Sequence, residues 1–327
     1  MKDFTKIAVA GCGYWGKNLV RNFSELGNLV ALFDVYEDAA FQMAEKYNVE
    51  SKSWEKILED DSIDGIVIAT PATSHYKLAS EALAAGKGVF VEKPLALTTC
   101  EAEKLINEAN FAKRTLMVGH LLQYHSAFIK VKELVNKGDI GNLRRIYSNR
   151  LSFGKVRTEE NVLWSFAPHD ISMILSLIGE EPLNVDATGS AHLTRGIEDY
   201  AQVQLNFNNN ISAHIFVSWL NPFKEQKLVV VGDKGMIVFD DTQAQEQKIA
   251  FYNHQVFIDD GVPSLSKADA EFISFEIKEP LKEECRTFIN CIATGSNAYT
   301  DGKEGLRVLK VLESAQNCID SRKLIER

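Results

Sequence analysis

The sequence predicts an α/β protein of two domains, a doubly wound parallel sheet followed by an α+β domain with a mostly antiparallel open sheet. Three observations predict this fold. The chain has 327 residues, which is long for one hydrophobic core. Its first half alternates apolar strands with amphipathic helices, and its second half contains strands in which apolar and polar residues alternate. We place the domains at residues 1–122 and 123–327.

The first half begins with a short apolar strand at residues 5–10, followed by a helix that ends near Gly27. Near-continuous Val and Ile runs indicate strands that are buried on both faces, as in a parallel sheet covered by helices. Right-handed crossovers make such a sheet doubly wound. The further strands are predicted at 29–35, 65–70, 88–93 and 115–120, with helices between them.

The pattern changes after about residue 142, where strict alternation indicates antiparallel strands with one packed face. Residues 199–207 and 211–220 alternate in this way, and residues 227–239 are expected to form two strands joined at Gly232–Gly235. Two helices are predicted at the end of the chain, near 280–293 and 303–321. The last of them could pack back on the first domain.

Composition excludes several classes of protein. A net charge of -9 argues against a nucleic-acid-binding protein, which usually has a basic face. The five cysteines show no CxxC pair and no metal-ligand spacing, so free thiols and no metal site are expected. The N-terminus has no apolar signal core, and no apolar run is long enough to span a membrane. We therefore expect a cytoplasmic protein that does not associate with a membrane.

A glycine-rich turn joins the first strand to the first helix. Gly11, Gly13 and Gly16 form a GxGxxG pattern, with Tyr14 and Trp15 between the last two glycines. Such glycines permit a tight turn, a close approach of the backbone to a pyrophosphate, and close packing of helix on strand. The helix N-terminus adds free N–H groups and partial positive charge. The pattern predicts dinucleotide binding by these residues; the alternative is a packing turn without a ligand.

Asp34, at the end of the second strand, follows the glycines by about 20 residues, the spacing expected for an acidic residue that binds the adenosine ribose. A carboxylate there accepts hydrogen bonds from both ribose hydroxyls and repels a 2′-phosphate. NAD is therefore favoured over NADP as the cofactor. The alternative for Asp34 is a helix or turn cap.

Two further segments carry a family resemblance. They are "ATPATSHYKLASEALAAGKGVFVEKPLALT" (69–98) and "GNLRRIYSNRLSF" (141–153). Together with the glycine turn, they resemble the Gfo/Idh/MocA family of oxidoreductases. The resemblance implies a Rossmann domain followed by an α/β domain with an open, mostly antiparallel sheet.

The most specific part of the resemblance is Glu92-Lys93-Pro94. In the family, the lysine contacts the nicotinamide ribose and the substrate hydroxyl, and the proline peptide is cis. Lys93 is therefore expected to be catalytic, and its place at the carboxyl end of a parallel strand agrees with this role. Glu92 is expected beside it as a structural partner within the cofactor site.

Other site residues are implied by the same resemblance. Thr70, Pro71 and His75 resemble a turn that packs against the nicotinamide, although a packing or capping role for His75 is equally open. His169 matches the family's acid/base histidine, but the aspartate expected four residues earlier is replaced by Ser165. Asp170 is the substitute that would orient the imidazole; the alternative is that His169 caps a helix after Pro168.

The substrate contacts are expected at Tyr124, Arg157 and Trp164, together with His169 and Asp170. Tyr124 lies in the segment resembling the family's linker between domains, and Arg157 and Trp164 precede the His169 helix. Arg157 could grip a phosphate and Trp164 could stack on a base, but an exposed loop arginine is an equal alternative.

The expected activity is hydride transfer between nicotinamide and a sugar hydroxyl or keto carbon, with a nucleotide-linked amino sugar of surface-polysaccharide pathways as the substrate by analogy. The alternatives are a free sugar or cyclitol dehydrogenase of the inositol type, a non-catalytic NAD-binding sensor, and elimination or hydrolysis through transient oxidation. The open sheet face predicts a homodimer or homotetramer.

Overall fold

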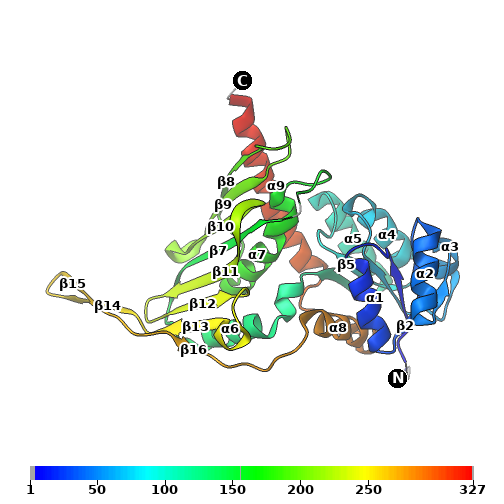
Figure 1. The fold of residues 1–327 in the computed structure, drawn as a ribbon, viewed down its shortest axis with the longest axis horizontal. Helices are drawn as coiled ribbons and strands as arrows, with labels where there is room; N and C mark the ends of the chain where they lie inside the picture. The colour runs from blue at the N-terminus through cyan, green and yellow to red at the C-terminus, as the bar shows by residue number, and fades with distance from the viewer. Residues whose placement is uncertain (1–3, 155, 326–327) are drawn as a thin grey trace. The chain divides into compact units, whose positions relative to one another are not determined.

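A computed structural model describes residues 4–154 and 156–325, which form two compact units (Figure 1). The first unit contains the chain up to Tyr124 together with Lys278–Leu309. The second contains His125–Ile277 and the chain from Lys310 onward. We expected that the last helix could pack back on the first domain; the segment that returns to the first unit consists of α8 (Pro280–Thr294) and the start of α9 (Gly302–Ile325).

The first unit is built on a parallel sheet of six strands in the order β3-β2-β1-β4-β5-β6. Successive strands are added in one direction from β1 to β3 and in the opposite direction from β4 to β6. In such sheets, ligands bind outside the carboxyl ends of the strands where the direction reverses, here between β1 and β4. The strands are β1 (Ile7–Ala10), β2 (Leu29–Phe33), β3 (Glu50–Ser51), β4 (Gly65–Ile68), β5 (Gly88–Glu92) and β6 (Leu116–Gly119). The sequence predicted all of them except β3, a two-residue edge strand.

Helices cover both faces of this sheet because its central strands are apolar on both sides. The connecting helices are α1 (Gly16–Glu25), α2 (Glu37–Tyr47), α3 (Trp54–Glu59), α4 (His75–Ala84) and α5 (Thr99–Ala112). Right-handed crossovers place α1 and α2 on one face and α4 and α5 on the other. Helix α8 joins the α1 face, where the ring of Phe288 lies 6.4 Å from that of Phe23 and 5.6 Å from that of Phe90.

The second unit contains a sheet of eight strands in the order β16-β13-β12-β11-β7-β10-β9-β8. All neighbours pair antiparallel except β7 and β10, so the predicted mostly antiparallel sheet is confirmed. The strands are β7 (Leu143–Phe153), β8 (Asn184–Ser190), β9 (Tyr200–Asn206), β10 (Ser212–Ser218), β11 (Leu220–Gly232), β12 (Met236–Asp240), β13 (Ile249–Tyr252) and β16 (Glu271–Phe272).

Alternation along these strands creates one packed face. In β10, Ala213, Ile215 and Val217 are fully buried, while the residues between them are partly exposed. Helix α7 (Val162–Ile178) contacts β7, β9 and β10, and α6 (Ser126–Lys137) contacts β12. The packed face of the sheet therefore lies against α7, the helix that carries His169.

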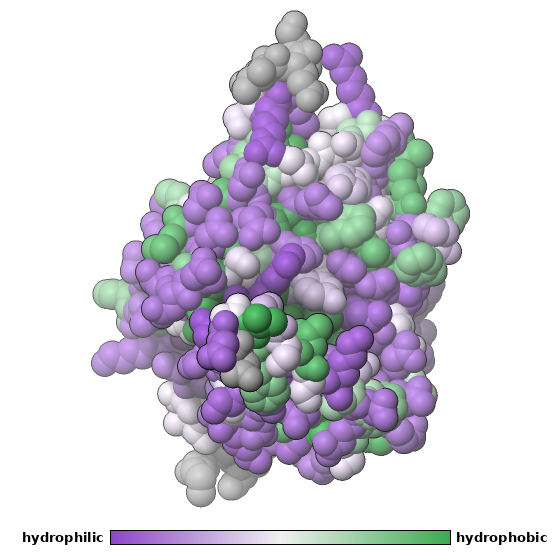
Figure 2. Space-filling view, turned by 90° about the vertical axis from the view of Figure 1, so that its left-hand side faces the viewer, coloured by the Kyte–Doolittle hydropathy of each residue, from purple (hydrophilic) through white to green (hydrophobic). Residues whose placement is uncertain are grey.

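A separate hairpin, β14 (Gln255–Asp259) and β15 (Val262–Ser266), extends from the second unit (Figure 1). Val256 pairs with Leu265 and Ile258 with Pro263, so one face of the hairpin is apolar. These side chains are exposed, and Figure 2, which views the molecule from the hairpin's side, shows hydrophobic surface at the front.

Candidate active site

The glycine-rich turn after β1 has the geometry that a diphosphate requires. Gly11 adopts a positive φ of 101°, and a Cβ there would lie 2.5 Å from the carbonyl oxygen of Ala69. A Cβ on Gly16 would overlap the carbonyl group of Gly11, so this glycine lets α1 approach the strand. At Gly13 a Cβ would meet nothing within 4 Å, so the backbone there faces open space.

The N-terminus of α1 also suits an anion. Within the described part of the chain, α1 has no acidic residue in its first turn and no side-chain cap. The N–H groups of Lys17 and Asn18 donate to the carbonyls of Gly13 (3.2 Å) and Trp15 (2.9 Å), and the helix dipole favours negative charge at this end. Tyr14 is exposed beside the turn and Trp15 is partly exposed. The residues present therefore fit a dinucleotide, as the sequence predicted for this turn.

Asp34 connects the second strand to the glycine turn. Its Oδ2 accepts a hydrogen bond from the backbone N–H of Cys12 (2.7 Å), and its Oδ1 accepts one from that of Tyr36 (2.9 Å). Each carboxylate oxygen can accept a further hydrogen bond. The capping alternative and ribose binding are therefore compatible at this residue, because the contacts to the turn hold the carboxylate next to the glycines.

The turn after β4 contains Thr70, Pro71 and the short helix that leads into α4. Thr70 Oγ1 lies 2.7 Å from Ser74 Oγ, and Ser74 donates to the carbonyl of Pro71 (2.8 Å). His75 is 1% exposed, and its Nδ1 and Nε2 lie 2.7 and 2.9 Å from the carbonyl oxygens of Pro94 and Thr70. The ring therefore joins two backbone turns, and the cofactor contact expected for His75 stays a prediction.

The segment after β5 holds Glu92, Lys93 and Pro94. The peptide bond between Lys93 and Pro94 is cis, as the resemblance implied. Lys93 is partly buried, whereas Glu92 is buried and accepts a hydrogen bond from Trp15 Nε1 (2.5 Å). Burial raises the pKa of Glu92 above its ordinary value, and the Trp15 hydrogen bond and the Lys93 charge act in the opposite direction.

More buried titratable groups lie near Glu92 in the first unit. Glu284 on α8 is fully buried, and neither of its carboxyl oxygens has a hydrogen-bond partner among the described residues. Burial, followed by the charges of Glu92 and Glu304, raises the pKa of Glu284 well above its ordinary value. His120 Nδ1 lies 2.5 Å from Glu304 Oε2. Glu92 therefore belongs to a group of interior carboxyls that the sequence analysis did not predict.

Tyr124 was expected near the substrate, and this expectation stays a prediction. The side chain is 5% exposed, and its hydroxyl lies 3.0 Å from Thr300 Oγ1. Burial, and then the charge of Glu284, raises the pKa of this hydroxyl. Tyr124 therefore packs inside the first unit, since the returning segment that contains Thr300 covers it.

In the second unit, His169 lies well inside α7. The helix begins at Val162, where the side chain of Asn161 caps it by accepting a hydrogen bond from the Trp164 N–H (3.2 Å). The alternative in which His169 caps a helix after Pro168 is therefore wrong, because the cap lies eight residues earlier. Ser165 and His169 are four residues apart on one face of this helix, and Ser165 is buried.

Asp170 is held in a buried ion pair. Its Oδ2 accepts from Arg150 Nε (2.7 Å), and its Oδ1 accepts from Arg150 Nη2 (3.2 Å) and Ser148 Oγ (2.5 Å). Asp170 is 1% exposed and its carboxylate fixes α7 to β7, while its expected contact with substrate stays a prediction. Arg150 was missed, although it continues the inward positions of Ile146 and Ser148 on β7.

Arg157 and Trp164 are also placed in the second unit. Arg157 is half-buried and pairs with Glu160 (2.8 Å), and Trp164 Nε1 donates to Gln316 Oε1 (3.1 Å). The expected substrate contacts of these two residues remain predictions. The Trp164 contact links α7 to the part of α9 within the same unit.

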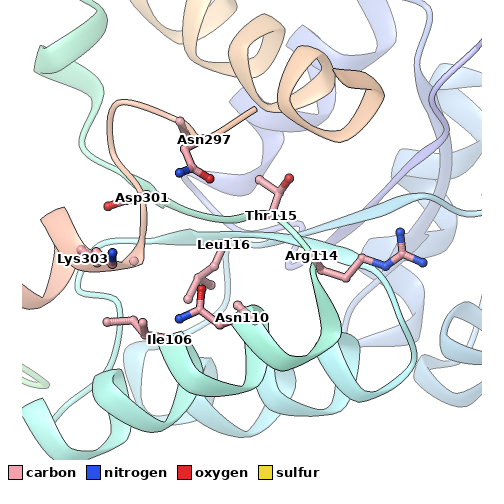
Figure 3. Close-up of a pocket in the computed structure, with 11 residues that line it drawn as sticks. Ile106, Asn110, Arg114, Thr115, Leu116, Asn297, Asp301 and Lys303 are labelled. Carbon is pink, nitrogen blue, oxygen red and sulfur yellow. The ribbon is translucent and has the colours of Figure 1, made fainter. Parts of the chain in front are cut away.

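Figure 3 shows a pocket in the first unit lined by residues of α5, the start of β6 and the segment that leads into α9. Because Leu116 begins β6, this pocket lies at the opposite edge of the parallel sheet from the glycine turn. The side chain of Arg114 extends away from the other labelled residues. The pocket is therefore separate from the candidate active site.

The fold and the glycine turn define an oxidoreductase that binds a nicotinamide dinucleotide. Residues 5–120 match the model of the oxidoreductase family with an NAD-binding Rossmann fold, and residues 128–238 match the Gfo/Idh/MocA C-terminal domain. The chain belongs to the Gfo/Idh/MocA family of oxidoreductases.

Two curated relatives span nearly the whole chain. One is the UDP-N-acetylglucosamine 3-dehydrogenase of Acidithiobacillus ferrooxidans, 26% identical over 310 residues, which cover 93% of this chain and 94% of the relative. The other is the myo-inositol 2-dehydrogenase of Thermotoga maritima, 26% identical over 336 residues and 98% of both chains. Both are named dehydrogenases, and their names differ in substrate.

Solved structures show the same fold. The structure of the Acidithiobacillus ferrooxidans UDP-N-acetylglucosamine 3-dehydrogenase GnnA matches with a TM-score of 0.86 and 24% identity, covering 97% of this chain and 98% of that one. GenD2 from gentamicin A biosynthesis, in complex with NAD, matches with a TM-score of 0.82 and 20% identity, covering 98% and 95%. Across residues 4–154 and 156–325, no helix is both long and apolar enough to cross a membrane.

Proposed function

We propose that this protein is an NAD-dependent dehydrogenase that oxidises a hydroxyl of a nucleotide-linked amino sugar. The observation that carries the proposal is the arrangement of one sheet edge, where the open glycine turn after β1 and Lys93 after β5 both follow the carboxyl ends of strands. NAD supplies hydride transfer at its nicotinamide ring when it is bound.

The preference for NAD over NADP is assigned to Asp34. Its carboxylate is held beside the glycine turn by the N–H groups of Cys12 and Tyr36, so a negative charge occupies the place where a 2′-phosphate would approach. Repulsion there favours a cofactor with a free ribose diol.

We assign the removal of the proton from the substrate hydroxyl to Lys93 and His169. The Lys93 ammonium holds the substrate hydroxyl for loss of its proton, and the His169 imidazole accepts this proton. Asp170 acts on this pair only through the fold, since its carboxylate holds α7 against Arg150.

The substrate class rests on the relatives. Similarity to the UDP-N-acetylglucosamine 3-dehydrogenase supports oxidation at C3 of a UDP-linked amino sugar. The equally similar myo-inositol 2-dehydrogenase makes a cyclitol the second candidate substrate. A sensor that binds NAD without catalysis is the third, since Ser165 replaces the family's aspartate. We assign the reaction to the cytoplasm, which suits a chain whose five cysteines are all free.

The test is to incubate the purified protein with NAD or NADP and either UDP-N-acetylglucosamine or myo-inositol, and to record NADH absorbance. We expect reduction of NAD with the sugar nucleotide and weaker binding of NADP by calorimetry. Reduction with myo-inositol alone would favour the cyclitol reading. Tight NAD binding without reduction by any polyol or sugar nucleotide would favour the sensor.

We also propose a homodimer or homotetramer. The sheet of the second unit carries aromatic side chains on the face away from the buried residues of β10: Tyr147 stacks on His214 at 5.3 Å, and Tyr200 lies 5.2 Å from Phe216. Such a face suits an interface between copies. Light scattering is expected to give at least twice the chain mass of 36.6 kDa, and a monomeric mass would contradict the proposal.

A further inference from the structure

We propose that Trp15 and Glu92 form a positioning pair that connects the glycine-rich turn to Lys93, an inference that rests on the proposed function. Trp15 belongs to the turn that receives the diphosphate, and Glu92 immediately precedes Lys93. The hydrogen bond from Trp15 Nε1 to Glu92 Oε1 (2.5 Å) joins them across 77 positions of sequence. Binding at the turn is thereby linked to the position of the catalytic ammonium.

The direction of the Glu92 side chain follows from strand alternation. Phe90 and Glu92 lie two residues apart on β5 and share a face. The ring of Phe90 packs on Phe288 of α8, so Glu92 faces the α1 and α8 side of the sheet. Its second oxygen, Oε2, accepts from the backbone N–H of Lys93 (3.3 Å). One carboxylate therefore contacts both the turn residue and the lysine backbone.

The space around Glu92 holds the carboxyl group in this position. Gly119 on β6 leaves the necessary room, because a Cβ there would lie 2.8 Å from Glu92 Oε2. A carboxylate that is only 9% exposed depends on the donors that it has, since burying it without them costs free energy. Removing the Trp15 donor is therefore expected to displace Glu92, and Lys93 with it.

The neighbouring charged groups increase the need of the Glu92 carboxylate for the hydrogen bond from Trp15. Glu284 and Glu304 bring further carboxyls into the interior of this unit, His120 pairs with Glu304, and Lys93 offsets part of the negative charge. Burial disfavours the ionised form of Glu92, and the hydrogen bond from Trp15 favours it. The hydrogen bond from Trp15 thus offsets part of the cost of burying the ionised form of Glu92, which accepts both N–H groups.

The chain contains a matched control for this pair. Trp54 Nε1 on α3 donates to Glu81 Oε2 on α4 (2.7 Å), which is also a tryptophan–glutamate hydrogen bond in the first unit. Neither residue belongs to the glycine turn or to the Lys93 segment. Trp15→Phe and Trp54→Phe therefore remove the same kind of donor at two places.

The first measurement needs no cofactor. Amide hydrogen exchange is followed in the peptide that contains Glu92 and Lys93, in the wild-type protein and both variants. We expect exchange to be faster by about 10-fold in Trp15→Phe and unchanged in Trp54→Phe, because a hydrogen bond to a carboxylate stabilises the segment locally. Equal exchange in the two variants would overturn the inference.

The second measurement uses NAD and the substrate found in the panel. Trp15→Phe is expected to lower kcat by about 10-fold while the Kd of NAD, from calorimetry, changes by less than about threefold. Trp15→Phe combined with Glu92→Gln should be no slower than the slower single variant, since both act through one contact. Fully multiplicative losses would overturn the inference. A wild-type protein that binds no dinucleotide would instead refute the proposed function, while the exchange measurement still decides the Trp15–Glu92 pair.

Discussion

Lys93 is the residue on which the proposed chemistry depends most directly. Replacing it with alanine removes the ammonium but leaves the glycine turn and Asp34 unchanged. We expect Lys93→Ala to lower kcat by about 10²- to 10⁴-fold, the range for loss of a group that assists proton transfer, while calorimetry shows nearly unchanged NAD binding. Lys104→Ala, at an exposed position of α5, is the control. Turnover close to that of the wild type would remove Lys93 from the mechanism.

His169 is expected to set the pH dependence of turnover. An imidazole accepts a proton only in its neutral form, so activity should fall on the acid side, where a catalytic imidazole becomes protonated. His169→Asn keeps a polar side chain on α7 but cannot titrate. We expect a lower kcat and loss of the acid limb from its pH profile. A variant that is slower but keeps the wild-type profile would show that another group accepts the proton.

The sequence predicted the residues whose role depends on local backbone. Gly11, Gly16 and Asp34 could be assigned because a strand, a turn and a helix follow one another within a short segment. The partners of Glu92 and Asp170 could not, because Trp15 and Arg150 lie 77 and 20 positions away from them, and only the fold brings them together. Two features of the sequence could nevertheless have indicated buried polar residues. Arg150 stood at an inward position of its strand, and Glu284 stood on the apolar stripe of its helix, between Leu281 and Phe288.

At the scale of the elements, most strands and helices were predicted, but the start of α7 was not. The alternative for His169 placed the start of this helix after Pro168, since proline is common in the first turn of helices. The structure begins the helix at Val162, and Pro168 lies inside it. Asn161 was the better signal, because asparagine caps helices and an apolar run follows it. The difference moves His169 and Asp170 from a helix end into its interior.

Helix α7 is fixed to the sheet by the ion pair of Arg150 with Asp170. Arg150→Met would leave the Asp170 carboxylate buried without its guanidinium, and we expect a loss of about 3–5 kcal/mol in the free energy of unfolding, measured with urea. Arg145→Met, at an exposed position on the same strand, is the control. Arg150→Met with Asp170→Leu should recover much of the loss, since an apolar pair can replace a buried ion pair. A stable single variant would contradict this role.

At the scale of the whole molecule, stability should depend on pH through the interior carboxyls. The folded pKa of Glu284 lies well above its ordinary value, whereas the unfolded chain exposes this carboxyl to water. The folded protein therefore binds a proton that the unfolded chain releases as pH rises. This stabilising contribution is fully present below the ordinary carboxyl pKa and is lost as pH rises toward the folded pKa.

Glu284→Gln isolates that contribution, because a glutamine has nearly the same shape and does not titrate. We expect the free energy of unfolding of the variant, relative to the wild type, to increase between about pH 5 and about pH 8 by an amount of order 1 kcal/mol or more. Comparing this difference at two pH values cancels the cost of burying the amide. Glu45→Gln, at an exposed position of α2, should follow the wild type. A Glu284→Gln variant with the wild-type pH dependence would mean that Glu284 ionises in the folded protein as readily as in the unfolded chain.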